Sequence, residues 1–190
     1  MSSERICEMD TEEMLIGMRM FLHGLGVDLK DQHLIRTPER VVKAWAEEFA
    51  SGYSQDPKKI LSVEFVEDCD EMIIVKDIPF TSHCSHHLVQ FSGTCKIGYV
   101  PRKKITGLSK LARVLDVYAK RLQVQERLTR QVAEAIQKYL TPLGTGVVIS
   151  AVHSCMVCRG VQKPGSVTIT SCLLGKMRTD KAMRQEFLNF

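Results

Sequence analysis

The sequence predicts an α+β protein in which an antiparallel sheet carries helices on one face and is preceded by N-terminal helices. Along residues 58–190 the hydrophobic pattern changes from strand-like alternation to helical spacing and back, in the order ββααββ. Strands that follow one another in pairs favour hairpins, so a doubly wound parallel sheet is not expected. Neither a G-x-G-x-x-G motif nor a Walker loop is present, so any nucleotide must be held in another way.

The first 57 residues form the predicted N-terminal helical region. Apolar residues from Thr11 to about His23 recur at helical spacing, and we expect this helix to end near Gly24. A second helix is predicted in "RTPERVVKAWAEEF", where Thr37 is placed to cap the helix and Pro38 fits its first turn. The polar stretch "SGYSQDPKK" then predicts the loop that leads into the main domain.

The main domain contains two predicted pairs of strands with two helices between them. The first pair lies in "EMIIVKDIPF" and "FSGTCKIGYVP", and the second in "GVVISAVHSCMV" and "SVTITSCLL". Helical spacing covers about 109–122 and 125–140. We expect this pair of helices to cover one face of the sheet.

The composition is that of an ordinary globular protein, with 44% hydrophobic and 25% charged residues among 190. The N-terminal "MSSERICEMDTEEM" lacks the apolar core of a signal peptide, and no apolar run is long enough to span a membrane. These features predict a cytoplasmic protein. In that compartment thiols stay reduced, so the seven cysteines favour metal ligands and buried thiols over a disulfide framework.

Positive charge is concentrated in residues 101–130, which hold nine Lys and Arg against Asp116 and Glu126. Such a block is typical of a solvated helix face, a nucleic-acid footprint or a pocket for a small polyanion. The nucleic-acid alternative lacks the interleaved aromatic residues that stack on bases, because only 6% of the chain is aromatic. No nucleic-acid partner is therefore expected.

The stretch "SHCSHH" predicts a metal site. Cys84 and His87 have a spacing common for two zinc ligands on one turn, and Cys155 and Cys158 repeat that spacing later in the chain. All four residues could form a closed structural site. Alternatively, three of them could hold a catalytic zinc and leave one position for water. The spacing does not choose between these alternatives.

Two further histidines favour the catalytic alternative. His86 stands beside the metal turn, and His153 lies two residues before Cys155, on the same face if both belong to one strand. A structural zinc site needs no such neighbours, whereas hydrolysis needs a general acid or base close to the metal.

A second group of residues predicts a phosphate site. Lys110 and Arg113 share one face near the start of a helix, and Arg40 and Lys43 repeat this arrangement on the earlier helix. Each pair alone could be solvated surface charge. Together with Arg159, the two pairs suit a ligand that carries several phosphates.

Gln125 and Glu126 stand at the junction between the two central helices. As surface residues they would need no explanation. In a pocket, however, the carboxylate could accept hydrogen bonds from two adjacent N–H donors, the pattern that guanine presents through N1 and its 2-amino group.

These stretches together resemble the GTP cyclohydrolase I family. The resemblance runs in order from "RTPERV" at residue 36 through "GYVP", "GLSKLAR", "KRLQVQERLT" and "HSCMVCRGVQKPGS" to "EFL" at residue 188. It implies the tunnelling fold, a ring-based homo-oligomer that is usually a decamer, and active sites between subunits with GTP as the substrate.

The resemblance also implies residue roles. Cys84, His87 and Cys155 would be the ligands of a Zn²⁺ cofactor, which selects the open site, and His86 and His153 would be catalytic imidazoles. Further residues would contact the substrate: Glu126 and Gln125 at the guanine, Ser109 near the ribose, and Lys110, Arg113, Arg159, Arg40 and Lys43 around the triphosphate.

The implied reaction is the first step of tetrahydrofolate and pterin biosynthesis. Zinc-activated water attacks C8 of GTP while His153 protonates the ring nitrogen, formate leaves, and the sugar carbons close onto the freed amine to give 7,8-dihydroneopterin triphosphate. His86, His153 and Ser109 would move the protons.

Two positions depart from the family pattern. Ser85 stands where the family usually has glutamate, and Cys158 could complete a closed zinc site. Two rival hypotheses follow: a zinc-stabilised polyanion-binding protein without catalysis, and a relative with the same fold that acts on another purine or pterin.

Overall fold

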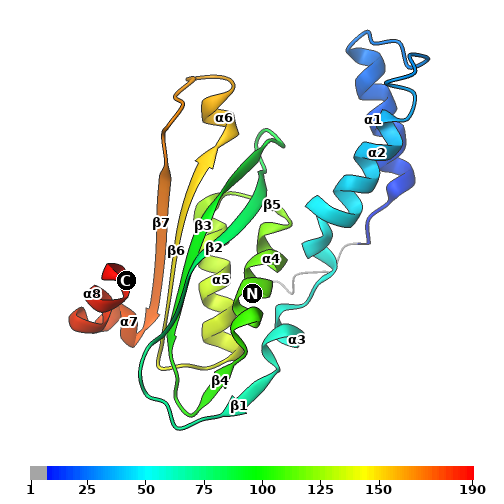
Figure 1. Ribbon diagram of the computed structural model, residues 1–190. Helices are drawn as coiled ribbons and strands as arrows, with labels where there is room; N and C mark the ends of the chain where they lie inside the picture. The colour runs from blue at the N-terminus through cyan, green and yellow to red at the C-terminus, as the bar shows by residue number, and fades with distance from the viewer. Residues whose placement is uncertain (1–7) are drawn as a thin grey trace.

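The computed structural model describes residues 8–190 and has an α+β architecture (Figure 1). A five-stranded sheet forms the body, with the strand order β5-β2-β3-β6-β7. Helices α4 (Leu108–Ala119) and α5 (Gln125–Tyr139) cover one face, and an N-terminal helical segment projects from the body. The predicted α+β class is confirmed.

Four long strands of the sheet pair in antiparallel fashion: β2 (Ile73–Cys84), β3 (Gln90–Val100), β6 (Gly144–His153) and β7 (Thr168–Gly175). The fifth strand, β5 (Leu122–Gln123), pairs in parallel with the end of β2. The sheet is therefore mixed, and the prediction of a wholly antiparallel sheet is wrong at this edge. The link between α4 and α5 contributes only two residues to β5, too few to show a strand pattern.

Several short elements interrupt the predicted order of two strands, two helices and two strands. β4 (Lys104–Thr106) lies between β3 and α4 and pairs with β1 (Glu64–Val66) in a separate two-stranded sheet. The helical turn α6 (Ser154–Val157) separates β6 from β7. The alternation of side chains along the long strands still determines which residues form the core. Phe91, Ile97 and Ile149 face α4 and α5 and are fully buried.

The N-terminal segment contains α1 (Thr11–Gly24), α2 (Thr37–Ala44), the π-helical turn η1 (Trp45–Phe49), the 3₁₀ turn η2 (Ser51–Ser54) and α3 (Pro57–Leu61). The predicted cap at Thr37 is wrong: Arg36 is the cap, and the Thr37 hydroxyl donates to the His33 carbonyl of the preceding turn. No side chain of α1 is buried. The predicted boundary between 1–57 and 58–190 stays a prediction.

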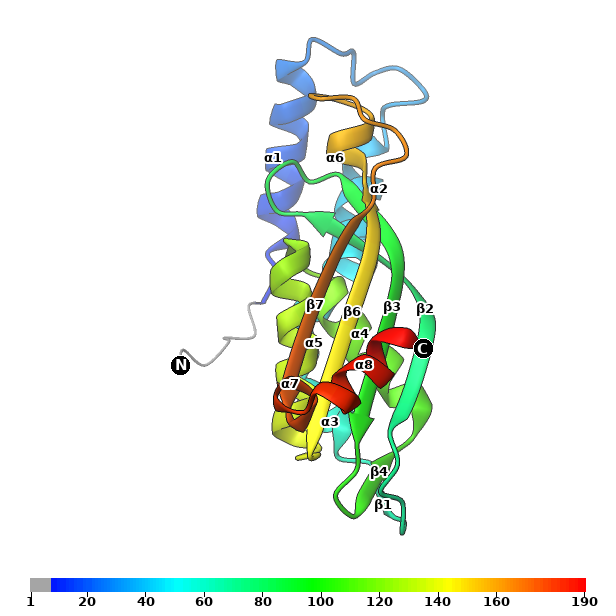
Figure 2. The same ribbon diagram turned by 90° about the vertical axis from the view of Figure 1, so that its left-hand side faces the viewer.

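The C-terminal helices α7 (Lys176–Thr179) and α8 (Lys181–Asn189) follow β7. Figure 2 shows α8 across the face of the sheet opposite to α4 and α5. Phe187 is fully buried there against Gly98 and Gly146, where an added Cβ would lie 2.8 Å and 2.6 Å from its ring. Helices thus lie on both faces, and the prediction of helices on one face is incomplete.

Within residues 8–190, every helix is too short or too polar to traverse a lipid bilayer.

Candidate functional site

The first part of the site is the tight turn between β2 and β3. β2 ends at Cys84, whose amide donates to the Val89 carbonyl at 2.9 Å, while Leu88 donates back to the Cys84 carbonyl at 2.8 Å. Leu88 adopts a left-handed conformation with φ of 57°, which closes the turn in few residues. The turn brings His87 back over Cys84.

The second part comes from the end of β6. The register between β3 and β6 pairs Phe91 with His153, so β6 ends beside the start of β3 and hence beside the turn. The chain then enters α6, whose first turn carries Cys155. Strand pairing between residues about sixty positions apart therefore assembles the site.

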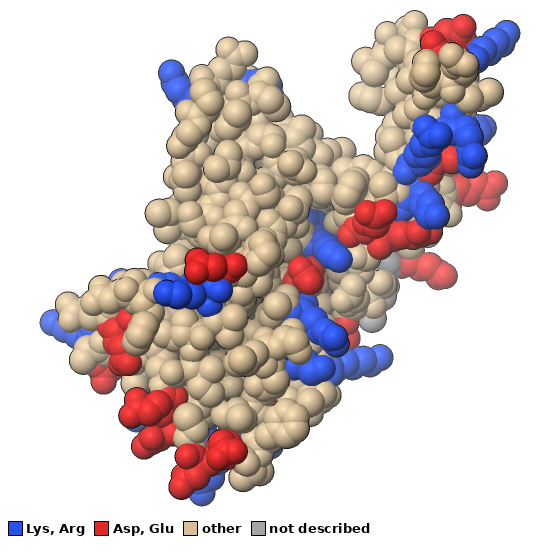
Figure 3. All heavy atoms as spheres, viewed as in Figure 1, with Lys and Arg blue, Asp and Glu red and all other residues tan. Residues whose placement is uncertain are grey.

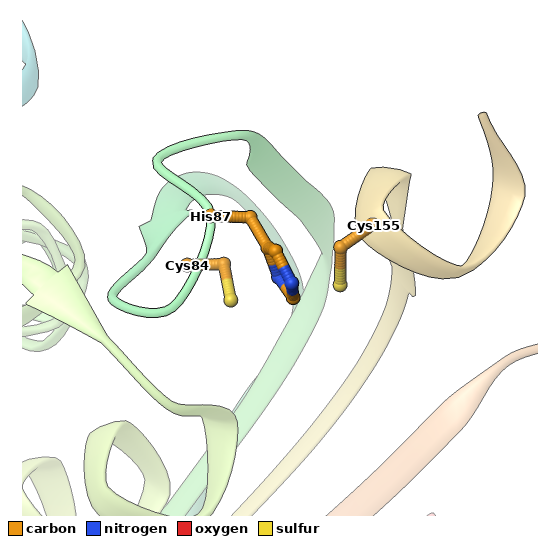
Figure 4. Close-up of side chains that lie close together, drawn as sticks. All are labelled: Cys84, His87 and Cys155. Atoms are coloured by element: carbon orange, nitrogen blue, oxygen red, sulfur yellow. The ribbon is translucent and has the colours of Figure 1, made fainter. Parts of the chain in front are cut away.

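Three side chains converge at this point: Cys84, His87 and Cys155 (Figure 4). Their sulfur and nitrogen ligand atoms all lie within 4.8 Å of one another. Two ligands of one tetrahedral zinc ion lie about 3.8 Å apart, so a small movement of the side chains would let all three reach the same ion. Thiolates and imidazole are the ligands that zinc prefers, and this set fits it.

The electrostatics of the two thiols also suit a cation. Burial raises the pKa of the Cys155 thiol, and the neighbouring Cys84 raises this pKa further. Two thiolates so close together repel each other, and a divalent cation between them would reverse this effect.

Cys158 does not belong to the cluster that the described residues form. It is the C-cap of α6 and is exposed to solvent. The cluster therefore contains three protein ligands, which leaves a tetrahedral ion one open position.

His153 is held beside the cluster by two contacts. Its ring stacks on Phe91 with a centroid separation of 4.6 Å and an angle of 3°, and its Nε2 lies 2.7 Å from Gln125 Oε1. Burial lowers the pKa of His153, and the nearby Glu126 carboxylate acts in the opposite direction. His153 is the last residue of β6, whereas Cys155 is helical, so the expected strand alternation between them does not apply.

The other histidine, His86, is exposed in the turn. Its Nδ1 lies 3.8 Å from Cys84 Sγ, and its ring centroid lies 6.2 Å from that of His87. Ser85, next to it, is half-buried, and its amide donates to the Gln123 carbonyl at 2.9 Å. The turn is thereby joined to β5.

Glu126 and Arg159 lie close to the cluster in the same chain. Glu126 is exposed in the first turn of α5, which follows β5 directly, and β5 pairs with Cys84. Arg159 follows α6, and its Nη1 lies 3.1 Å from His87 Nε2. A carboxylate and a guanidinium are thus available beside the three ligands.

Ser109, Lys110 and Arg113 lie far from the cluster. They occupy the first turns of α4, which begins just after β4 at the opposite end of the sheet (Figures 1 and 2). β3 starts beside the cluster and runs for 11 residues toward β4, which amounts to on the order of 30 Å. One chain does not bring these residues to the Cys84–His87–Cys155 cluster.

Arg40 and Lys43 form a third location. Both lie on α2, which Figure 1 shows well separated from α6. Figure 3 shows basic and acidic side chains interspersed on the α1–α2 segment, whereas the part of the body around α6 carries few charged side chains on the face in view. The predicted phosphate-binding residues are therefore divided among three parts of the chain.

A comparison with protein families gives a match to the GTP cyclohydrolase I model over residues 15–190. The chain belongs to this family of enzymes. The "GTP cyclohydrolase 1" of Janthinobacterium sp. (strain Marseille) is 52% identical over 172 residues, which cover 90% of this chain and 86% of the relative. That of Mycobacterium tuberculosis (strain ATCC 25618 / H37Rv) is 47% identical over 190 residues, covering 99% and 94%.

Two further similarities each cover only about half of one of the two proteins compared. The "GTP cyclohydrolase 1" of Drosophila melanogaster is 51% identical over 178 residues, which cover 93% of this chain and 55% of the relative. A solved structure, "Crystal structure of the archaeosine synthase QueF-Like in the apo form", superposes with a TM-score of 0.46 at 16% identity over 55% of this chain and 93% of that one.

Sequence reasoning missed the residues that hold His153 in this GTP cyclohydrolase I family member. Phe91 shows in the sequence only as a strand residue, and its contact with His153 arises from the register between β3 and β6. Gln125 is expected at the guanine, and the structure shows that its side-chain Nε2 also contacts the Ile149 and Thr168 carbonyls and Thr170 Oγ1 inside the protein. Neither contact leaves a signal in local spacing.

Proposed function

We propose that this enzyme hydrolyses GTP, opens the imidazole ring, releases formate and closes a new ring to give 7,8-dihydroneopterin triphosphate, the first step of tetrahydrofolate and pterin biosynthesis. The observation that carries this proposal is the Cys84–His87–Cys155 cluster with His153 beside it. Membership of the GTP cyclohydrolase I family supports GTP as the substrate.

Zinc is the metal that we propose for the cluster. Cys84, His87 and Cys155 would hold it, since their donor atoms and spacing fit a tetrahedral ion. When bound in such an open site, zinc polarises a water molecule and lowers the pKa of that water to about 7.

The residues of the chain would then bind the substrate and move protons. His153 protonates the imidazole nitrogen of guanine as C8 is attacked, and it can do so because Gln125 and Phe91 fix its ring beside the cluster. Glu126 accepts hydrogen bonds from guanine N1 and the 2-amino group, and Gln125 supports this pocket. His86 and Ser109 handle protons as the sugar rearranges.

The triphosphate would be bound by a set of cations: Lys110, Arg113, Arg159, Arg40 and Lys43. Of these, only Arg159 lies beside the cluster of the same chain. The separation of the others supports a site shared by several subunits, as expected for a tunnelling-fold homo-oligomer, and we propose the decamer. In this proposal residues 58–190 form the catalytic domain, and residues 1–57 contribute α2 to a neighbouring site.

We also propose that the enzyme works in the cytoplasm, where a reducing environment keeps Cys84 and Cys155 available as ligands.

The experiment that tests this function is an incubation of zinc-loaded protein with GTP, followed by ultraviolet absorbance and a formate assay. We expect a pterin chromophore and stoichiometric formate, both abolished when a chelator removes the metal. Unchanged GTP in the presence of a fully loaded metal site would refute the proposal.

A second candidate substrate is another purine nucleotide. Ser85, in the turn that carries His87, stands where the family usually has glutamate, so the surroundings of the cluster differ from the family pattern. The same assay with adenosine, inosine and xanthosine triphosphates decides between the substrates, because only a guanine-specific pocket would reject all three.

A further inference from the structure

Gln125 is buried, with only 1% of its surface exposed, and its side chain makes four polar contacts inside the protein. Its Nε2 lies 3.1 Å from the Ile149 carbonyl, 3.0 Å from the Thr168 carbonyl and 3.1 Å from Thr170 Oγ1. Its Oε1 lies 2.7 Å from His153 Nε2. The glutamine thus connects β6 and β7 to the histidine beside the metal cluster.

These contacts determine which way the amide faces. Backbone carbonyls only accept hydrogen bonds, so the two carbonyls from Ile149 and Thr168 require the NH₂ group on their side. A flipped amide would place its oxygen against both carbonyl oxygens, which repel it and have no hydrogen to donate to it. The oxygen therefore faces His153.

The neighbouring threonines agree with this assignment. Thr129 Oγ1 lies 2.8 Å from the backbone carbonyl oxygen of Gln125 and can only donate to it. In the 2.7 Å pair of the two hydroxyls, Thr170 must then be the donor to Thr129. Thr170 has thus used its proton and can only accept from the amide of Gln125, whose two N–H groups are shared among three acceptors: the Ile149 and Thr168 carbonyls and Thr170 Oγ1.

The orientation of the amide decides the tautomer of His153. An amide oxygen has lone pairs and no proton, so the imidazole nitrogen that faces it carries the hydrogen. In the neutral ring the other nitrogen, Nδ1, then carries the lone pair. Stacking on Phe91, with the two rings 3° from parallel, restrains the plane of the imidazole.

We propose that Gln125 is a positioning residue that holds His153 in the Nε2–H tautomer, so that Nδ1 is the nitrogen that exchanges a proton with the substrate. The second half of this statement rests on the proposed function, in which His153 protonates the purine. The first half rests on the hydrogen bonds alone. Gln125 thereby acts on the reaction through His153 and not through a contact with guanine.

The chain offers a matched control for this role. Gln123 is also 1% exposed, and its Nε2 donates to the Tyr118 carbonyl at 3.0 Å and to Gln131 Oε1 at 2.8 Å. Its Oε1 accepts from Arg127 Nε at 3.0 Å. Gln123 is therefore a buried glutamine with a similar set of hydrogen bonds, none of which goes to His153.

The test compares Gln125→Met with Gln123→Met in the zinc-loaded, full-length protein. Methionine keeps the length of the side chain but removes both donors and the acceptor. Nitrogen-15 NMR of ring-labelled histidine separates protonated from unprotonated ring nitrogens, and the signals that vanish in His153→Phe identify His153. The spectra are recorded well above the ordinary pKa of histidine, about 6.5, where the ring is neutral.

We expect wild type and Gln123→Met to show His153 with a protonated Nε2 and an unprotonated Nδ1. Gln125→Met should show a mixture of tautomers, and its kcat with GTP should fall by about 10²- to 10⁴-fold, the range for loss of a correctly oriented general acid or base. KM should change far less, because the glutamine does not contact the substrate.

Each outcome bears on one part of the inference. A wild-type His153 that is protonated on Nδ1, or an unchanged tautomer in Gln125→Met, overturns the positioning role. Equal losses of kcat in both methionine variants, with the tautomer retained, would show a merely structural role. If wild type shows the Nε2–H tautomer but converts no GTP, the proposed function fails while the tautomer assignment stands.

Discussion

At the scale of single residues, the Cys84–His87–Cys155 cluster shows what the sequence can and cannot decide. The Cys-x-x-His spacing identified Cys84 and His87, and the repeat of this spacing identified Cys155 together with Cys158. The choice between three and four ligands depends on the folded chain, in which Cys158 is the exposed C-cap of α6 and lies outside the cluster that the described residues form. Local spacing does not contain this information, since the length of α6 follows from how the chain returns to β7.

Cys155 and Cys158 should therefore respond differently to substitution. We expect Cys155→Ala to lose most of its bound zinc, because two protein ligands hold the ion much more weakly than three. Cys158→Ala should retain close to one zinc per chain and most of the activity. Zinc measured by mass spectrometry after desalting, beside turnover of GTP, gives both results. Loss of the metal from Cys158→Ala would show that a four-ligand site forms when zinc binds.

Glu126 separates recognition of the base from binding of the metal. We expect Glu126→Gln to keep its zinc but to lose about tenfold to a hundredfold in kcat/KM for GTP, because hydrogen bonds to a charged group contribute about 1.5–3 kcal/mol. The amide also presents a donor to a guanine N–H donor. Steady-state kinetics with the metal content determined in parallel measures this effect. Kinetics equal to wild type would remove Glu126 from the guanine pocket.

At the scale of elements, the sequence predicted the parts that have a strong period of their own. α5 lies where 125–140 was expected, and α4 begins within one residue of its predicted start. The sequence did not predict the parallel pairing of β5 or the π-helical turn at Trp45–Phe49. Both depend on contacts that form only in the folded chain. Trp45 and Phe49 both contact the ring of His83, with centroids 4.8 Å and 4.6 Å away, beside Cys84.

The position of α8 was missed for a similar reason. Gly98 and Gly146 interrupt two strand patterns, and a sequence does not reveal that the resulting space is filled by a helix from the C-terminus. Phe187 fills this space and is fully buried. Its removal would therefore leave a cavity in a well-packed core.

We expect Phe187→Ala to lower the free energy of unfolding by about 3–5 kcal/mol, through lost burial and the cavity over the two glycines. Leu188→Ala is the matched control, because Leu188 is 43% exposed on the same helix and should change stability by about 0.5 kcal/mol or less. Urea unfolding followed by circular dichroism measures both variants. Equal stability of the two would mean that α8 is not anchored through Phe187.

At the scale of the whole molecule, the residues predicted for one site lie in separate regions of one chain. The cluster with His153 and Glu126 is at one end of the sheet, Lys110 and Arg113 begin α4 at the other end, and α2 with Arg40 projects away from the body. The triphosphate of GTP carries three to four negative charges and needs cations around it, within the length of one nucleotide from the residues that hold the base. One chain in this conformation does not bring these groups together, and this separation is the reason we propose that several copies of the chain assemble to complete the site.

Mixing two defective variants tests this arrangement directly. The double variant Arg40→Ala/Lys43→Ala lacks cations from α2, and His153→Ala lacks the imidazole, so each should be nearly inactive when refolded alone. The two variants are then unfolded and refolded together at equal amounts. A site that takes α2 from one subunit and the imidazole from another receives an intact α2 with a probability of one half, and an intact imidazole with a probability of one half. About a quarter of the wild-type activity should therefore return. Native mass spectrometry verifies that mixed assemblies form. If such assemblies are present and activity remains at the level of the separate variants, α2 and His153 serve the same site within one chain, and the separation seen in the structure must close by a movement of α2.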